Sequence, residues 1–164
     1  AVAMALDAQM RVASRTGERL IPACAFFLGA MDTALVPGDL LLGIEVAAAT
    51  PGDGFGFAEI AERRGDYALA GAAVARRAAE GGGVRATVFG VGDAPVLVEA
   101  ASRILSATPP AHWDAALLAE AQAEAERELV DFAFDPLRAR LAGVAVARAV
   151  RDLVQRAPHG RSKA

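Results

Sequence analysis

The sequence has little of several residue types that mark particular classes of protein. Its 164 residues include one cysteine, Cys24, which excludes an intramolecular disulfide framework and a zinc site built from several cysteines. Lysine occurs once, at Lys163, and no long basic run is present, so we expect no binding to nucleic acid. The apolar runs are well short of the ~20 residues of a membrane-spanning helix, so we expect no membrane span.

Alanine is the residue in excess: it accounts for roughly a quarter of the chain, far above ordinary usage. The sequence is 54% hydrophobic and 23% charged, with a formal net charge of −3, which excludes a disordered chain. Its length suits one domain, or one domain and a piece of another. Since residues 1–10 carry Asp7 and no basic leader, and a single cysteine is present, we expect a reducing, cytoplasmic location.

The first 50 residues predict short strands and turns. Residues 1–13 alternate loosely between apolar and polar and predict a strand pair with a turn near Asp7. Because this first segment reads as the middle of a strand, we expect the chain to begin inside a larger protein. The apolar run 40–46 lies between turn residues and predicts a buried strand. The apolar neighbours of Cys24 predict a buried, unreactive thiol.

A cluster of turn residues at 50–54 predicts a domain boundary. We therefore expect a first domain over residues 1–50, a second over 51–157, and a flexible tail over 158–164. After the boundary, alternation predicts one strand that begins at Phe55 and a second over 84–91. A turn at 81–83 joins the apolar stretch 67–79 to the second of these strands. Periodicity alone leaves the stretch 67–79 open between strand and helix.

The last third of the chain predicts three helices. The first covers 96–107, with Asp93 or Ala94 at its start; the second begins near Trp113 and runs to Leu129; the third begins at Asp135–Pro136. Strands followed by helices indicate an α+β fold, with a three-stranded antiparallel sheet packed against the three helices.

Few residues point to chemistry by themselves. His112 and His159 have no His or Cys neighbour at metal-ligand spacing, so exposed loop histidines are the better interpretation. The glutamates from Glu120 to Glu128 are typical of a solvated helix face. Gly90 and Gly92 precede a predicted helix, but the third glycine of a dinucleotide fingerprint is missing and Asp93 is negative, which argues against a phosphate site.

Tyr67 is the one residue whose setting suggests a ligand. It is the single tyrosine, it follows the charged bend 63–66, and small residues flank it. An aromatic ring with a polar tip in such a setting can stack on a planar ligand. The alternative is a tyrosine packed on a sheet with its hydroxyl in water.

Several segments, in order, resemble the medium subunit of molybdenum hydroxylases, the enzymes of the carbon monoxide, aldehyde and xanthine dehydrogenase type. The resemblance runs from about Gly17 to about Arg151 and is most specific at Phe26–Gly29 and Arg63–Ala68. The segments that carry it are 21–29, 33–41, 57–71, 89–96 and 140–146.

This resemblance implies a fold and a function for the chain. It implies the end of a PCMH-type FAD-binding domain, followed by the C-terminal domain of the flavoprotein subunit. Such a subunit uses FAD to relay electrons from molybdenum and iron–sulfur centres to an external acceptor. No counterpart of the glycine-rich loops that cradle the FAD pyrophosphate is present, so the resemblance covers the C-terminal half only. We expect this chain alone to be inactive and to bind no FAD stably.

The resemblance also implies site residues and partners. Leu41 corresponds to an apolar wall of the flavin, Tyr67 to a residue beside the isoalloxazine, and Glu59 to a position near the polar edge of the flavin. Several relatives have lysine where Glu59 stands, so the charge there is reversed. The implied partners are a large subunit with the molybdenum cofactor and a small subunit with 2Fe–2S clusters. With one cysteine, this chain cannot ligate a cluster by itself.

Two other hypotheses remain open at this point. One is a non-catalytic α+β module that bridges subunits without bound flavin. The other is an ordinary globular domain whose likeness to the family reflects its alanine content. Flavin-binding loops in preceding sequence, or a flavin spectrum, would favour the flavoprotein.

Overall fold

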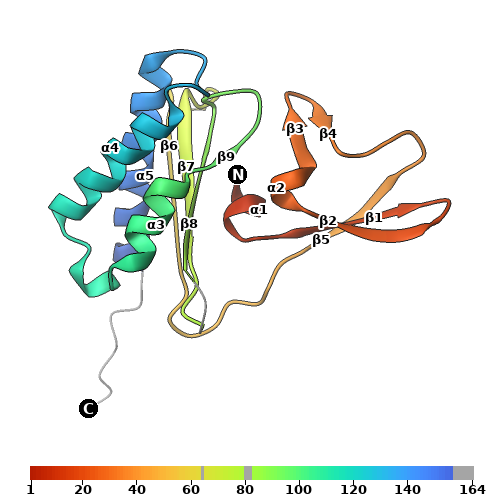
Figure 1. Ribbon diagram of the computed structural model, residues 1–164, viewed down its shortest axis with the longest axis horizontal. Helices are drawn as coiled ribbons and strands as arrows, with labels where there is room; N and C mark the ends of the chain where they lie inside the picture. The colour runs from red at the N-terminus through yellow and green to blue at the C-terminus, as the bar shows by residue number, and fades with distance from the viewer. Residues whose placement is uncertain (64, 80–82, 157–164) are drawn as a thin grey trace.

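The structure is a computed structural model that describes residues 1–63, 65–79 and 83–156. The predicted tail 158–164 and most of the predicted turn 81–83 lie outside these residues. Figure 1 shows a four-stranded sheet with three helices on one side and the N-terminal part of the chain on the other. Antiparallel sheets followed by helices make an α+β fold, as predicted.

The N-terminal part contains a small antiparallel sheet in the order β2-β1-β5 and a two-stranded hairpin, β3-β4. Residues 1–13 do not form the predicted strand pair. Their first half is a single helical turn, closed by bonds from the Ala5 and Leu6 amides to the carbonyls of Ala1 and Val2. The elements are α1 (Val2–Ala5), β1 (Gln9–Ser14), β2 (Gly17–Pro22), α2 (Ala23–Phe26), β3 (Phe27–Gly29), β4 (Asp32–Thr33) and β5 (Leu40–Glu45).

Two burial predictions for this part are wrong. The strand expected over 40–46 is present as β5, but it is exposed on both faces: Leu40 is 64% and its neighbour Leu41 38% exposed. In the described part of the chain, β5 is an edge strand that pairs with β1 alone. Cys24 is exposed, because α2 turns Ala23 and Phe26 into the small core and leaves Cys24 outside.

The C-terminal sheet has the antiparallel order β6-β7-β8-β9. Its strands are β6 (Gly54–Ile60), β7 (Ala70–Arg76), β8 (Val84–Phe89) and β9 (Val96–Leu97). The stretch left open over 67–79 is therefore a strand in its central part. It is buried on both faces, which gives the continuous apolar pattern that periodicity could not assign. The short fourth strand, β9, was not predicted.

The helices follow as α3 (Glu99–Ala107), a 3-10 turn (Pro110–His112), α4 (Ala115–Leu129) and α5 (Pro136–Arg156). The second and third begin as predicted: the Asp114 carboxylate accepts from the Leu117 amide, and Asp135 accepts from the Arg138 amide. The first begins at Glu99 rather than Val96, because Val96 and Leu97 pair with β8.

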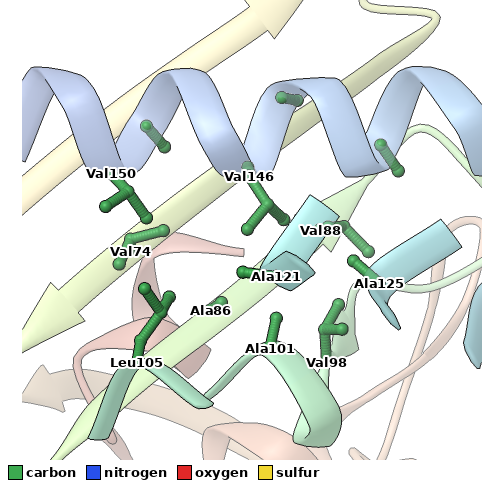
Figure 2. Packing of buried hydrophobic residues seen from close by; sticks show 14 of the residues in the cluster. Val74, Ala86, Val88, Val98, Ala101, Leu105, Ala121, Ala125, Val146 and Val150 are labelled. Atoms are coloured by element: carbon green, nitrogen blue, oxygen red, sulfur yellow. The ribbon is translucent and has the colours of Figure 1, made fainter. Parts of the chain in front are cut away.

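One face of the sheet packs on the helices. Figure 2 shows small apolar side chains from β7, β8 and all three helices meeting in this core, including Val74, Val88, Ala121 and Val146. Alanine lets the layers approach closely, and glycine does so at the edge, where Gly56 lies against the backbone of α5. The alanine excess of the sequence is thus a packing feature.

The other face of the sheet meets the N-terminal part. Ala5 of α1 packs on Ala73 and Ala75 of β7. From β8, Arg85 donates through Nε to the Met4 carbonyl at 3.1 Å and pairs with Asp7 at 3.3 Å. No helix in the described part of the chain is long and apolar enough to cross a membrane. The domain division at residue 50 stays a prediction.

Candidate functional site

The three predicted site residues come from two separate parts of the fold. Leu41 is on β5 of the N-terminal sheet, Glu59 is near the end of edge strand β6, and Tyr67 is in the loop that joins β6 to β7. Glu59 pairs with Gly71 near the start of β7, so the Glu59 backbone and the Tyr67 loop share one end of the C-terminal sheet. Their role toward a flavin stays a prediction.

The Tyr67 ring is fully exposed. This excludes the alternative in which the ring packs on the sheet, and it leaves the ring available to a planar ligand. The loop is held by its backbone: the Leu69 amide donates to the Ile60 carbonyl at 2.8 Å, and the Asp66 amide donates to the Arg63 carbonyl at 3.2 Å. Gly65 has a φ of +93°, a left-handed conformation that other residues rarely adopt.

A pair of phenylalanines extends this end of the sheet. Phe57 of β6 stacks on Phe89 of β8, with ring centroids 5.7 Å apart and an interplanar angle of 20°. The two rings meet across β7 because Gly71 lies between them; a Cβ on Gly71 would lie 2.2 Å from the Phe89 ring. Phe57 remains 45% exposed. We define Phe57, Gly71 and Phe89 as the aromatic platform.

Sequence reasoning missed the aromatic platform, although a signal for it exists. Successive residues of a strand point to opposite faces, so Phe57 and Glu59 share a face, as do Thr87 and Phe89. Aligning the two strands on either side of Gly71, which has no side chain to separate them, would have predicted that Phe57 and Phe89 stack.

Several hollows lie away from the predicted residues, and two of them adjoin aspartate side chains. One, of about 160 Å³, lies beside the edge strand β6 and is lined by Leu6, Phe55 and Asp152 among others. There the Asp152 carboxylate accepts from the Phe57 amide at 3.1 Å, and Arg156 and that amide lower the pKa of Asp152. The lining of this hollow is mainly apolar.

The second hollow, of about 500 Å³, lies between the Ser14–Thr16 and Val36–Asp39 turns. Asp39 pairs with Arg19 at its rim and accepts from the Val36 amide, and both contacts lower the pKa of Asp39. The Asp39 carboxylate is thus already engaged by its own neighbours. No group of three His, Cys, Asp or Glu residues that could hold a metal occurs in the described ranges.

The other residues considered as possible site residues from the sequence are glycines, glutamates and histidines. Gly90 and Gly92 do not lead directly into a helix, because β9 intervenes, and the carbonyl of Val91 between them accepts from the Phe134 amide. Glu128 is not simply solvated: its two carboxylate oxygens accept from the first amides of α3 at 2.9 and 2.8 Å. His112 is exposed, as expected, and His159 lies outside the described residues.

Comparison with known proteins identifies the relatives of this chain. No family model matches it. The medium chain of carbon monoxide dehydrogenase from Afipia carboxidovorans is 32% identical over 165 residues, which cover 96% of this chain and 56% of the relative. The chain is homologous to the medium subunit of carbon monoxide dehydrogenase. It corresponds to roughly the C-terminal half of that subunit, as the sequence motifs predicted.

Other relatives and solved structures match a similar share of this chain. Caffeine dehydrogenase subunit beta of Pseudomonas sp. (strain CBB1) is 31% identical over 97% of this chain and 55% of its own length. Among solved structures, carbon monoxide dehydrogenase from Hydrogenophaga pseudoflava matches 93% of this chain and 54% of that one, with a TM-score of 0.81 and 26% identity. Quinoline 2-oxidoreductase from Pseudomonas putida 86 matches 94% of this chain and 55% of that one, with a TM-score of 0.75 and 27% identity. The chain thus spans about half the length of the curated relatives it matches, and it is related to subunits of molybdenum-containing oxidoreductases.

Proposed function

We propose that this chain forms the C-terminal part of the FAD-carrying subunit of a molybdenum hydroxylase. In the complete subunit, bound FAD would supply the electron transfer between molybdenum and iron–sulfur centres on partner subunits and an external acceptor. The observation that carries the proposal is the match with the medium chain of carbon monoxide dehydrogenase over nearly the whole chain.

The residues of this chain suit a supporting role at a flavin. Tyr67 offers an aromatic ring with nothing packed on it, and Leu41 offers an apolar side chain that is 38% exposed. Glu59 is exposed near the same sheet end as Tyr67 and would face the polar edge of the ring system. FAD, when bound, supplies the electron transfer; these residues would cover and orient it and exclude water from it.

The exposed apolar side chains of the N-terminal sheet support the proposal that further polypeptide completes the site. Leu20 on β2 is 52% exposed and Leu40 on β5 is 64% exposed. They pair with Arg11 and Ala13 of β1, so both lie on the same face of the sheet. Apolar side chains exposed together mark a surface that another segment covers. We assign that cover, and the loops that hold the FAD pyrophosphate, to a segment equivalent to the N-terminal half of the relatives. The proposed partners are a molybdenum-binding large subunit and a 2Fe–2S small subunit.

The test is the flavin content of the assembled subunit with Tyr67→Ala. Loss of an aromatic stacking partner, at about 0.5–1.5 kcal/mol, weakens FAD binding roughly two- to tenfold. Tyr67→Phe keeps the ring and retains the flavin. Phe132→Ala, which removes a ring that is 61% exposed but is not among the predicted flavin residues, is the matched control.

Unchanged flavin content and unchanged acceptor reduction in Tyr67→Ala would reject the role given to Tyr67. An assembled wild-type protein without flavin would reject the flavoprotein proposal and favour the module that only bridges subunits. Tight FAD binding by residues 1–164 alone would contradict the assignment of the pyrophosphate loops to a separate segment.

A further inference from the structure

Arg138 links two loops at the sheet end where Tyr67 lies. It stands in the first turn of α5, and its Nη1 donates to the Leu69 carbonyl at 2.9 Å and also to the Gly90 carbonyl. Its Nε pairs with Asp135 at 3.4 Å, and its guanidinium lies 5.8 Å from the centre of the Phe134 ring. The side chain is 28% exposed, so the guanidinium is partly shielded from water.

The two carbonyls that Arg138 holds lie just beyond the last backbone pair of the β7-β8 ladder, Gly71 with Phe89. Backbone groups at such an end need partners from outside the ladder. A charged donor makes roughly twice as strong a bond as a neutral one, so a single guanidinium can fasten both loops. The loops also touch each other: a Cβ on Gly90, whose φ is +77°, would lie 2.9 Å from the Ala68 carbonyl oxygen.

These contacts hold the backbone that follows Tyr67. Its ring has no packing of its own, being fully exposed. Leu69, two residues further on, has both polar backbone groups engaged: its amide donates to Ile60 and its carbonyl accepts from Arg138. The backbone position of Leu69, just before β7, is therefore fixed by one hydrogen bond to β6 and one from α5.

We propose that Arg138 is a positioning residue for the Tyr67 loop: by holding the carbonyls of Leu69 and Gly90, it presents the Tyr67 ring to the flavin. This rests on the function proposed above. Its hydrogen bonds go to backbone carbonyls, so Arg138 acts through the backbone of the loop.

The test is a double-mutant cycle on FAD dissociation from the assembled flavoprotein. Arg138→Gln, Tyr67→Ala and the double variant are compared with wild type. Loss of the charged bonds raises the FAD dissociation constant about fivefold when Tyr67 is present, and leaves it unchanged when Tyr67 is already alanine. Arg138→Lys keeps a charged donor and restores part of the affinity. Arg140→Gln, an exposed arginine on the same helix, is the matched control with wild-type affinity.

An equal effect of Arg138→Gln with and without Tyr67 would overturn the proposal, since the arginine would then act on the fold in general. Hydrogen exchange of the Leu69 and Ala70 amides shows whether the positioning role of Arg138 or the flavin contact of Tyr67 is the part that fails. Exchange in Arg138→Gln as slow as in wild type overturns the role of Arg138, whatever Tyr67→Ala does. Faster exchange, together with FAD binding that is indifferent to Tyr67→Ala, supports the anchoring of the loop and overturns the flavin contact.

Discussion

Replacing Gly56 by alanine is the sharpest test of how the sheet and α5 fit together. Gly56 lies in β6, and its missing side chain faces α5. An added Cβ would lie 1.9 Å from the Ala149 carbonyl oxygen and 2.8 Å from the Leu153 amide nitrogen. Both are backbone atoms of a helix, so neither can rotate away. To reach ordinary van der Waals contact, α5 and β6 must separate by more than roughly 1 Å.

The cost of that separation follows from what α5 buries. The helix has 21 residues, and its inner face carries Val146, Val150 and Leu153 into the main core. Overpacking a dense core costs about 1–3 kcal/mol, and a backbone clash belongs at the upper end of that range or above it. For a chain of this size, a loss of about 3 kcal/mol lowers Tm by about 6–12 °C.

Thermal and urea unfolding of Gly56→Ala measure this loss directly. Gly43→Ala is the matched control, because an added Cβ in β5 would meet no atom within 4 Å. The control keeps its Tm or gains slightly, since alanine restricts the unfolded chain more than glycine does. If Gly56→Ala unfolded within about 1 °C of wild type, the close packing of α5 on β6 would be refuted.

Two further predictions concern carboxylates. The Asp53 side chain is 2% exposed and accepts from the Thr50 and Ala78 amides and from Arg77, contacts that hold its pKa well below its ordinary value. A carboxylate whose pKa is depressed in the folded state stabilises the fold at pH values above its ordinary pKa of about 4, and this stabilisation is lost as the pH falls further. Asp53→Asn is therefore less stable than wild type at pH 7, and the difference between their urea midpoints narrows between pH 4 and 3. A difference that stayed constant with pH would contradict this. Glu128→Ala removes the partner of the first amides of α3 and lowers the free energy of unfolding by about 1 kcal/mol, measured by thermal unfolding. Replacing Glu120, an exposed glutamate on the same helix as Glu128, by alanine is the control and costs under about 0.5 kcal/mol. Equal losses in the two variants would exclude a capping role for Glu128.

Local signals in the sequence determined much of the fold. The predicted starts of α4 and α5 lie at Asp114 and Asp135, and each of these residues caps the helix that follows it. Capping depends on residues within one turn of each other. Alternation placed β6 and β8, and the order of elements indicated the α+β class. The family motifs by themselves indicated the homology to medium subunits. Each of these conclusions rests on residues that are close together in the chain.

Tertiary structure decided burial and long-range contacts. The apolar residues of β5 are exposed and β7 is buried on both faces, although both strands are apolar runs, because burial depends on which layers lie against a strand. Periodicity carries no information about those layers. In the same way, the roles of Glu128 and Arg138 depend on partners 28 to 69 positions away in the sequence. Only the folded chain brings such groups within hydrogen-bond distance.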